Sequence, residues 1–250
     1  MVPTPSSCRR LVFSDEVGIG RALSELRYQD PKVQELSRCT YTPAMSTGAV
    51  RGRPGSVRRV GVLGGTFDPP HVGHLVTAID VLEQIDLDVV LMVVANEPWQ
   101  KVGSRTVTPA AIRLEMVQRA VEGIAGVEAS DIEVVRGGPS YTVDTLDELA
   151  RADPRVELHL ILGADAASLL HTWHRPRDVA ELCRVVVVDR PGTASALPDG
   201  FSGVVLEVPR LEVSSTDLRR RAAAGRSLRF LVADPVVSLI RELGLYRGPG

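Results

Sequence analysis

The sequence RRVGVLGGTFDPPHVGH, residues 58–74, decides the fold of this chain. Its first part is a short apolar run that ends at Gly64 and Gly65, which is typical of a buried parallel strand entering a tight loop. Its last part begins a helix, because apolar residues recur at helical spacing through Ile85. A glycine-rich loop between a strand and a helix start indicates a phosphate-binding location, since backbone N–H groups there can approach an anion closely.

The predicted helix start carries two histidines, His71 and His74. At this spacing both imidazoles can lie on one side of the helix and direct N–H groups at one phosphate. Gly73 leaves space between them. An isolated histidine is more often a satisfied polar residue near a turn, but the pair together with the glycines favours an anion site.

Three other motifs do not fit this stretch. A Walker A loop needs a lysine after its last glycine, where Thr66 and Phe67 stand. A dinucleotide fingerprint needs the spacing GxGxxG, which Gly61, Gly64 and Gly65 lack. A zinc protease helix needs HExxH, and no cysteine lies near the two histidines. Hydride transfer and metal-dependent hydrolysis are therefore not expected, and no metal ligand is assigned.

Strand and helix patterns alternate through the rest of the chain and predict an α/β fold with a doubly wound parallel sheet. We expect a single domain with a small helical part at its carboxyl end, and ligands beyond the carboxyl ends of the strands. The predicted strands cover residues 59–63, 88–95, 156–162, 184–189 and 204–208, with two short ones around Val127 and Val134. The predicted helices cover residues 75–85, 109–122 with Thr108 as cap, 141–152, 164–171 and 176–182, and two more begin near Ser214 and Asp234.

The composition is that of an ordinary globular protein. Of the 250 residues, 44% are hydrophobic and 24% are charged. A chain of this length is long enough to bury a sizeable core. The net charge of -2 supplies no broad field to attract nucleic acid or an acidic membrane. No apolar run approaches the roughly 18 residues of a membrane span, and the secretory signal pattern is missing. Three separated cysteines without a CxxC pair fit a reducing compartment, so we expect a soluble cytoplasmic protein.

Residues 1–57 differ in character from the rest of the chain. They show scattered apolar positions without strand alternation, and residues 46–56 consist of Gly, Ser, Thr, Pro, Ala, Val and Arg, which is typical of a linker. We expect a disordered extension and linker over residues 1–57 and a folded domain over residues 58–247. Met45 is an alternative start of translation.

The stretch GGTFDPPHVGH, residues 64–74, resembles the HxGH signature of the nucleotidylyltransferase superfamily. Five further stretches resemble, in order, motifs of bacterial nicotinate-nucleotide adenylyltransferases: residues 98–101, 139–146 and 163–165, Trp173, and residues 214–219. The closing residues 244–246 fit as well. The resemblance covers residues 58–247. It implies a Rossmann-like nucleotidylyltransferase fold and transfer of the adenylyl group of ATP to nicotinate mononucleotide, which yields deamido-NAD and pyrophosphate in NAD biosynthesis.

The resemblance also assigns roles to individual residues. The catalytic set is His71, His74, Lys101 and Arg219. The ATP-binding set is Gly64, Gly65, Thr66, Phe67, Gly73, His74, Gly163, Asp165, Ser214, Ser215, Thr216 and Arg219. The set for nicotinate mononucleotide is Lys101, Tyr141, Thr142, Trp173 and His174. Magnesium is expected to bridge the ATP phosphates, held mainly by substrate oxygens and water.

Several of these residues have a physical interpretation of their own. Arg219 can project from the first turn of a helix toward an anion, although a solvated basic face fits that segment equally well. Lys101 is one of two lysines and lies in the loop after the second strand, where a plain surface lysine is the alternative. Gln100 departs from the histidine common in the family, so its role stays open. Asp165 suits ribose hydroxyls or a helix cap, and Trp173 offers a flat face for stacking.

Other functions remain open from the sequence. Nicotinamide-mononucleotide and pantetheine-phosphate adenylyltransferases share HxGH, but the second group typically carries Thr at the position of His71. A nucleotide sensor without turnover is a non-enzymatic alternative, against which the intact His71, His74 and Arg219 argue. A fragment of a class I aminoacyl-tRNA synthetase would need a KMSKS-like lysine cluster, which the sequence lacks. A homo-oligomer is compatible with the sequence.

Overall fold

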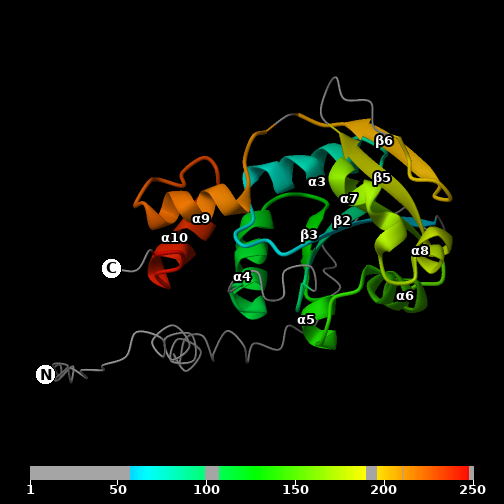
Figure 1. Cartoon of the computed structure of the whole chain (residues 1–250), viewed down its shortest axis with the longest axis horizontal. Helices are drawn as coiled ribbons and strands as arrows, with labels where there is room; N and C mark the ends of the chain where they lie inside the picture. The colour runs from blue at the N-terminus through cyan, green and yellow to red at the C-terminus, as the bar shows by residue number, and fades with distance from the viewer. Residues whose placement is uncertain (1–56, 99–106, 190–195, 210, 248–250) are drawn as a thin grey trace, which may run out of the picture. The chain divides into compact units, whose positions relative to one another are not determined.

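A computed structural model describes residues 57–98, 107–189, 196–209 and 211–247 (Figure 1). In these residues one sheet of six parallel strands has the order β3-β2-β1-β4-β5-β6. The strands are β1 (Arg58–Gly65), β2 (Val89–Val94), β3 (Val127–Ser130), β4 (Val156–Gly163), β5 (Cys183–Asp189) and β6 (Gly203–Glu207). The chain leaves β1 toward one edge and returns through β4 toward the other. The carboxyl ends of β1 and β4 therefore form the switch point at which ligands of such sheets bind.

Helices connect the strands and extend the chain beyond the sheet. They are α3 (Val72–Gln84), α4 (Ala110–Val121), α5 (Ile132–Arg136), α6 (Thr142–Ala152), α7 (Ala164–Ser168), α8 (Pro176–Leu182), α9 (Ser215–Ala223) and α10 (Asp234–Glu242), with a 3-10 turn at Leu170–Thr172. None of the helices in the described ranges has both the length and the apolar character of a membrane span.

The core consists of two apolar clusters, one on each face of the sheet. Successive side chains of a strand point to opposite faces, so β1 contributes Val60 and Val62 to one cluster and Leu63 to the other. The first cluster also contains buried residues of α6, α7 and α8, and the second contains buried residues of α3 and α4. Burial on both faces explains the β-branched runs of the central strands.

The carboxyl-terminal helical part consists of α9 and α10, which lie together at one end of the domain in Figure 1. Helix α10 contacts α4 and buries Leu239 and Ile240. At the start of α9, the Ser215 hydroxyl donates a 2.8 Å hydrogen bond to the carbonyl of Pro69. This bond attaches the helical part to the loop that follows β1.

The predicted doubly wound parallel sheet is confirmed, but three local predictions are wrong. The strand expected around Val134 is the helix α5, because the chain turns back there and Val134 packs against the cluster beneath α3 and α4. Thr108 is not the cap of α4: Pro109 occupies that position, and the Thr108 carbonyl instead accepts a 2.7 Å bond from Arg113 Nε. The single helix expected over 164–171 is α7 followed by the 3-10 turn. The extension over residues 1–57 stays a prediction, since residues 1–56 lie outside the described residues.

Candidate active site

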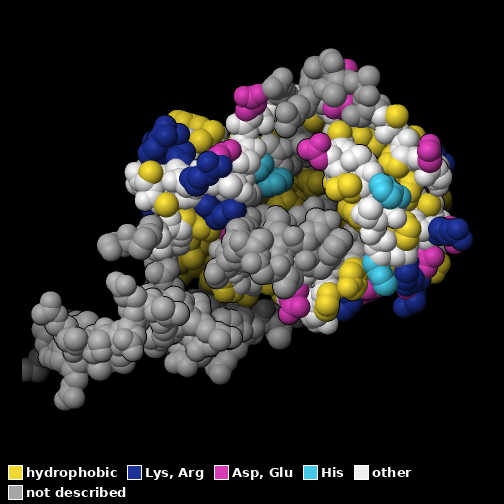
Figure 2. Space-filling view, in the orientation of Figure 1, with side chains coloured by type: hydrophobic (Ala, Val, Ile, Leu, Met, Phe, Trp, Pro, Cys, Tyr) yellow, Lys and Arg dark blue, Asp and Glu magenta, His cyan; other side chains and the backbone are white. Residues whose placement is uncertain are grey.

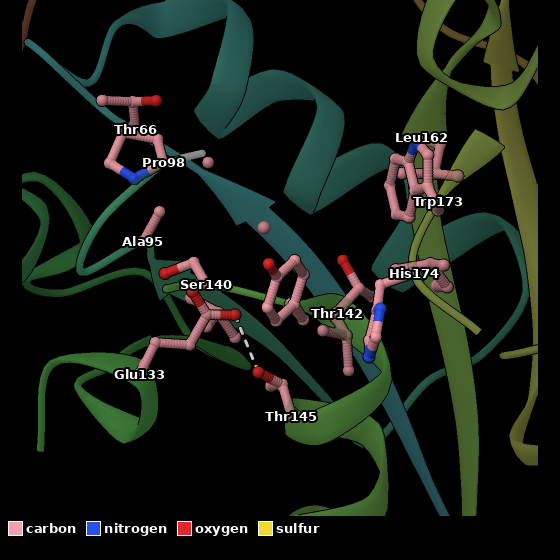
Figure 3. A pocket seen from close by; sticks show the side chains of 16 residues that line it. Thr66, Ala95, Pro98, Glu133, Ser140, Thr142, Thr145, Leu162, Trp173 and His174 are labelled. Carbon is pink, nitrogen blue, oxygen red and sulfur yellow. Dashed lines mark hydrogen bonds between the residues drawn. The ribbon is translucent and has the colours of Figure 1, made fainter. Parts of the chain in front are cut away.

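A cavity opens at the carboxyl ends of β1, β2 and β4, at the switch point of the sheet (Figure 3). One part of its wall is the turn after β1, with Gly64, Gly65 and Thr66. The remaining wall comes from Ala95 and Pro98 after β2, from α5, from the start of α6, and from residues 173–174. Segments far apart in the sequence therefore meet around one space.

The two histidines at the start of α3 form a fixed pair. The backbone N–H of His71 donates a 3.1 Å hydrogen bond to Nδ1 of His74, and the two rings stack with their centroids 3.6 Å apart. Because Nδ1 of His74 accepts a hydrogen bond, the proton of the neutral ring lies on Nε2. His74 is thus oriented as an Nε2–H donor.

His71 is uncharged at neutral pH. The residue is only 8% exposed, and burial lowers its pKa from 6.5 to about 4. Its Nδ1 has no hydrogen-bond partner among the described residues. An anion at this helix start would therefore meet neutral N–H groups and the helix dipole rather than an imidazolium charge.

Two glycines of the motif are required by close contacts. A Cβ atom at Gly65 would lie 2.8 Å from the ring of Phe67. A Cβ atom at Gly73 would lie 3.1 Å from both His71 Nδ1 and Val213 Cγ1. A side chain at Gly65 would displace the Phe67 ring, and one at Gly73 would require the His71 ring or Val213 to shift by a few tenths of an ångström.

Helix α9 brings a guanidinium to the same loop. Arg219 donates a 2.8 Å hydrogen bond through Nη1 to the carbonyl of Asp68 and a 3.1 Å bond through Nη2 to the hydroxyl of Thr216. Ser214 caps the helix, since its hydroxyl accepts the N–H of Asp217. Figure 2 shows arginine side chains gathered over the carboxyl-terminal helices, beside a hollow bordered by histidine. The starts of α3 and α9 thus combine two positive helix ends with a cation.

The opposite end of the cavity is aromatic. Tyr141 and Thr142 stand at the start of α6, and the ring of His174 lies 4.5 Å from that of Tyr141. Trp173 is half-buried, and its Nε1 has no hydrogen-bond partner in the described part of the chain. Figure 3 shows Thr142, Trp173 and His174 around this end of the cavity. A flat ring with a polar substituent fits such a wall.

The described residues contain no group of three or more His, Cys, Asp or Glu side chains that could hold a metal ion.

Comparison with known proteins gives the family of the chain. The cytidylyltransferase-like family matches residues 62–221. A relative from Exiguobacterium sibiricum, named "probable nicotinate-nucleotide adenylyltransferase", is 44% identical over 188 residues, which cover 75% of this chain and 98% of that protein. A relative of the same name from Saccharopolyspora erythraea is 42% identical over 194 residues, covering 76% of this chain and 91% of that one. The chain belongs to the nicotinate-nucleotide adenylyltransferase family.

A solved structure supports the fold of this family member. Nicotinic acid mononucleotide adenylyltransferase of Plasmodium falciparum, complexed with NaAD, has a TM-score of 0.63 at 14% identity and covers 76% of this chain and 97% of that one. At this identity the likeness shows the Rossmann-like fold alone. The family and the fold expected from the sequence motifs are both confirmed.

In this adenylyltransferase most of the predicted site residues lie at the cavity or at the loop beside it. The cavity is lined by Gly64, Gly65, Thr66, Tyr141, Thr142, Trp173 and His174. The adjoining loop and helix starts hold His71, Gly73, His74, Ser214, Ser215, Thr216 and Arg219.

Three predicted residues are placed differently, and the role of a fourth, Lys101, stays a prediction. The ring of Phe67 is buried against Gly65 and His74, so only its backbone is available to a ligand. Gly163 is the last residue of β4, and Asp165 is exposed in the first turn of α7; neither lines the cavity. Lys101, like Gln100, lies outside the described residues.

The sequence analysis did not single out four polar residues that organise the site. Glu133 lines the cavity, and Thr145 donates a 2.7 Å hydrogen bond to it. Ser140 accepts the N–H of Asn96 at 2.8 Å. Arg113 is 1% exposed and binds backbone carbonyls of two loops at the cavity. Ser140 and Thr145 could have been found within the motif at 139–146. Glu133 was missed because a strand was expected around Val134.

Proposed function

We propose that the chain transfers the adenylyl group of ATP to the phosphate of nicotinate mononucleotide and releases pyrophosphate. The observation that carries the proposal is one cavity that runs from the glycine turn after β1 to the aromatic wall at Trp173. The turn and the HxGH helix start offer donors to phosphate, and the aromatic wall offers a stacking face to a pyridine ring.

The nucleophile is the phosphate of the mononucleotide. A phosphomonoester has its second pKa near 6, so it is largely dianionic at neutral pH and needs no general base. One of its oxygens attacks the α-phosphorus of ATP in line. A new P–O bond forms, and the bond from the α-phosphorus to the bridging oxygen breaks with that electron pair going to pyrophosphate.

Catalysis then consists of positioning and charge stabilisation. Negative charge grows on the oxygens around the α-phosphorus, where His71, His74 and the backbone N–H groups of Gly65 and Thr66 are our candidates for donors. The fixed orientation of His74 supports its role, since a donor held in place before the reaction needs no reorganisation during it.

The triphosphate of ATP is assigned to the starts of α3 and α9. Arg219 lies beside the HxGH loop, and a guanidinium there can form charge-assisted bonds to phosphate oxygens. Lys101 is proposed for the mononucleotide phosphate, and Gly163 and Asp165 for the ATP ribose, as the family motifs imply. We propose that Mg²⁺ enters with ATP, bound by phosphate oxygens and water, and that it neutralises phosphate charge. No protein ligand to it is proposed.

Selectivity for the acid over the amide is assigned to donors at the aromatic end. The Thr142 hydroxyl and the backbone N–H of His174 can meet a carboxylate, while Trp173 stacks on the ring. An amide nitrogen in place of the carboxylate oxygen would leave a buried donor unmet, which costs about 1–3 kcal/mol. Two such contacts give a preference of about two to four orders of magnitude.

Pyrophosphate release with ATP and a panel of mononucleotides tests the function. We expect nicotinate mononucleotide to exceed nicotinamide mononucleotide in kcat/KM by about two to four orders of magnitude, and Thr142→Val to reduce that ratio. Thr172→Val is the matched control, because the Thr172 hydroxyl bonds the Leu169 carbonyl away from the cavity. Equal efficiencies in the wild type would reject the nicotinate assignment. No release with any mononucleotide would reject adenylyl transfer.

We also propose that the enzyme acts in the cytoplasm. Support comes from the use of ATP and from Cys183, which is a free, buried thiol, as a reducing compartment allows.

A further inference from the structure

Glu133 is a buried carboxylate in the wall of the cavity. It lies in the short helix α5, and the residue is only 7% exposed. Figure 3 shows it reaching from α5 toward the cavity, on the side away from Trp173. A carboxylate in a cavity for an anionic substrate needs a specific reason, because it repels both a phosphate and a nicotinate carboxylate.

One oxygen of Glu133 is held by a chain of polar side chains. Arg136 Nη2 donates a 2.9 Å hydrogen bond to the Thr145 hydroxyl, and arginine can only donate. The hydroxyl therefore directs its own hydrogen to Glu133 Oε1, at 2.7 Å. Arg136 is in turn fixed by Glu148, at 2.9 Å. The position of the Glu133 carboxylate is thus set before any ligand binds.

The other oxygen, Oε2, is free to accept a hydrogen bond from a ligand. It has no hydrogen-bond partner among the described residues, and it is not among the fully enclosed polar atoms that lack one. Since Glu133 lines the cavity and Thr145 engages Oε1, Oε2 is the carboxylate oxygen that remains for a ligand. An ionised carboxylate accepts hydrogen bonds and donates none, so its partner on the ligand must be a donor.

We infer that Glu133 binds the ribose hydroxyls of the mononucleotide substrate and makes the enzyme selective for a ribonucleotide. The inference rests on the proposed function. In that function the pyridine ring occupies the Trp173 end and the phosphate occupies the end at Thr66, so the ribose lies between two charged groups. The ribose is the neutral, donor-bearing part of the substrate, and a carboxylate that accepts from a ribose diol is a common device of nucleotide sites.

Deoxy analogues of the substrate test the contact directly. In the wild type we expect nicotinate mononucleotide to exceed its 2′-deoxy or 3′-deoxy analogue by about 10–100-fold in kcat/KM, as for a lost hydrogen bond to a charged group. Two equally good analogues would overturn the inference. This measurement needs no variant, so it stands whether or not a substitution disturbs folding.

The variant Glu133→Gln keeps the size of the side chain and removes its charge. We expect kcat/KM for nicotinate mononucleotide to fall by about 10–100-fold, mainly through KM, while the KM for ATP stays within about twofold. The ratio between the ribose and deoxy substrates should shrink to within about threefold, because the lost contact no longer distinguishes them. An unchanged ratio would assign Glu133 a structural role and overturn the inference.

Glu181→Gln is the matched control. It makes the same change at an exposed glutamate of α8 that does not line the cavity and takes no part in the Glu133 chain. We expect its ribose selectivity to equal that of the wild type. If the wild type shows no adenylyl transfer to nicotinate mononucleotide, the proposed function fails. If transfer proceeds without dependence on the hydroxyls, the inference about Glu133 fails alone.

Discussion

Tyr246 donates a 2.6 Å hydrogen bond to Asp68 Oδ1, which joins the carboxyl-terminal end of the domain to the HxGH loop. Asp68 is 1% exposed, and its backbone carbonyl accepts from Arg219. Burial, followed by the charge of Asp68, raises the pKa of Tyr246, so the phenol keeps its proton and remains a donor. Two residues that follow β6 therefore hold the loop in front of α3 through Asp68.

Replacing Tyr246 with Phe removes this bond without changing the ring. We expect a loss of about 1–3 kcal/mol in the free energy of unfolding, because a buried carboxylate oxygen loses a donor. We also expect a lower kcat, since the HxGH loop loses a constraint. Urea unfolding and steady-state kinetics measure the two effects. Ser238→Ala is the control, because it removes a hydroxyl of α10 that bonds only within its own helix, to Asp234; a similar loss there would contradict the role given to Tyr246.

Arg113 joins three loops through buried hydrogen bonds. Its guanidinium donates to the carbonyls of Thr66 at 2.9 Å, Asn96 at 3.0 Å and Thr108 at 2.7 Å. A lysine cannot reproduce this planar set of donors. We expect Arg113→Lys to lower the free energy of unfolding by about 2–4 kcal/mol, because carbonyls are left without a donor.

The control for Arg113 lies on the same helix. Arg119→Lys affects only a partly exposed ion pair with Glu115, so we expect a change within about 0.5 kcal/mol. Thermal or urea unfolding of both variants compares them. Equal losses of unfolding free energy in the two variants would show that the three carbonyl contacts of Arg113 do not stabilise the fold.

Much of the fold could be predicted because its signals are local. Strands such as β2 and β5 consist almost entirely of buried β-branched or apolar residues, and turn residues mark where they end. Val134 shows the limit of such signals. It has a residue type that favours strands, but the way the chain packs after β3 places it in a helix that also turns Glu133 into the cavity.

The contacts that complete the site join residues far apart in the sequence. The HxGH loop and the first turn of α9 could be identified because each has a local motif with glycines or a cap. The bond from Tyr246 to Asp68 could not, since neither residue type nor spacing predicts a pair 178 positions apart. The burial of Arg113 was equally hidden, because an arginine in an amphipathic helix usually lies on the solvated face.

His74→Ala should lower kcat by about two to three orders of magnitude, because it removes an oriented donor to the transition state. It also removes the acceptor of the His71 N–H, so we expect a loss of about 1 kcal/mol in stability. Steady-state kinetics and urea unfolding separate the two effects. Turnover close to that of the wild type would remove His74 from the proposed mechanism.

Removal of residues 1–44, so that the chain starts at Met45, should leave kcat/KM and the melting temperature nearly unchanged. That segment shows no periodic apolar face with which it could pack on the domain. Differential scanning calorimetry of both forms tests this prediction. A loss of several degrees would show that the extension stabilises the domain.

The burial of His71 makes the stability of the domain depend on pH below neutrality. The folded state lowers the pKa of His71 to about 4, whereas the unfolded chain keeps the ordinary value of 6.5. Between these values the unfolded chain binds a proton that the folded chain does not, so this stabilisation is complete above pH 6.5 and is lost as the pH falls toward 4. By pH 5 the loss of unfolding free energy from this one group is about 2 kcal/mol.

Urea unfolding at pH 7 and pH 5 tests this prediction. Between these pH values the free energy of unfolding should fall by about 2 kcal/mol less in His71→Gln, which cannot titrate, than in the wild type. His171→Gln is the control, because it replaces an exposed histidine, and it should follow the wild type. If His71→Gln and the wild type lose the same free energy, His71 is not the group that destabilises the fold in acid.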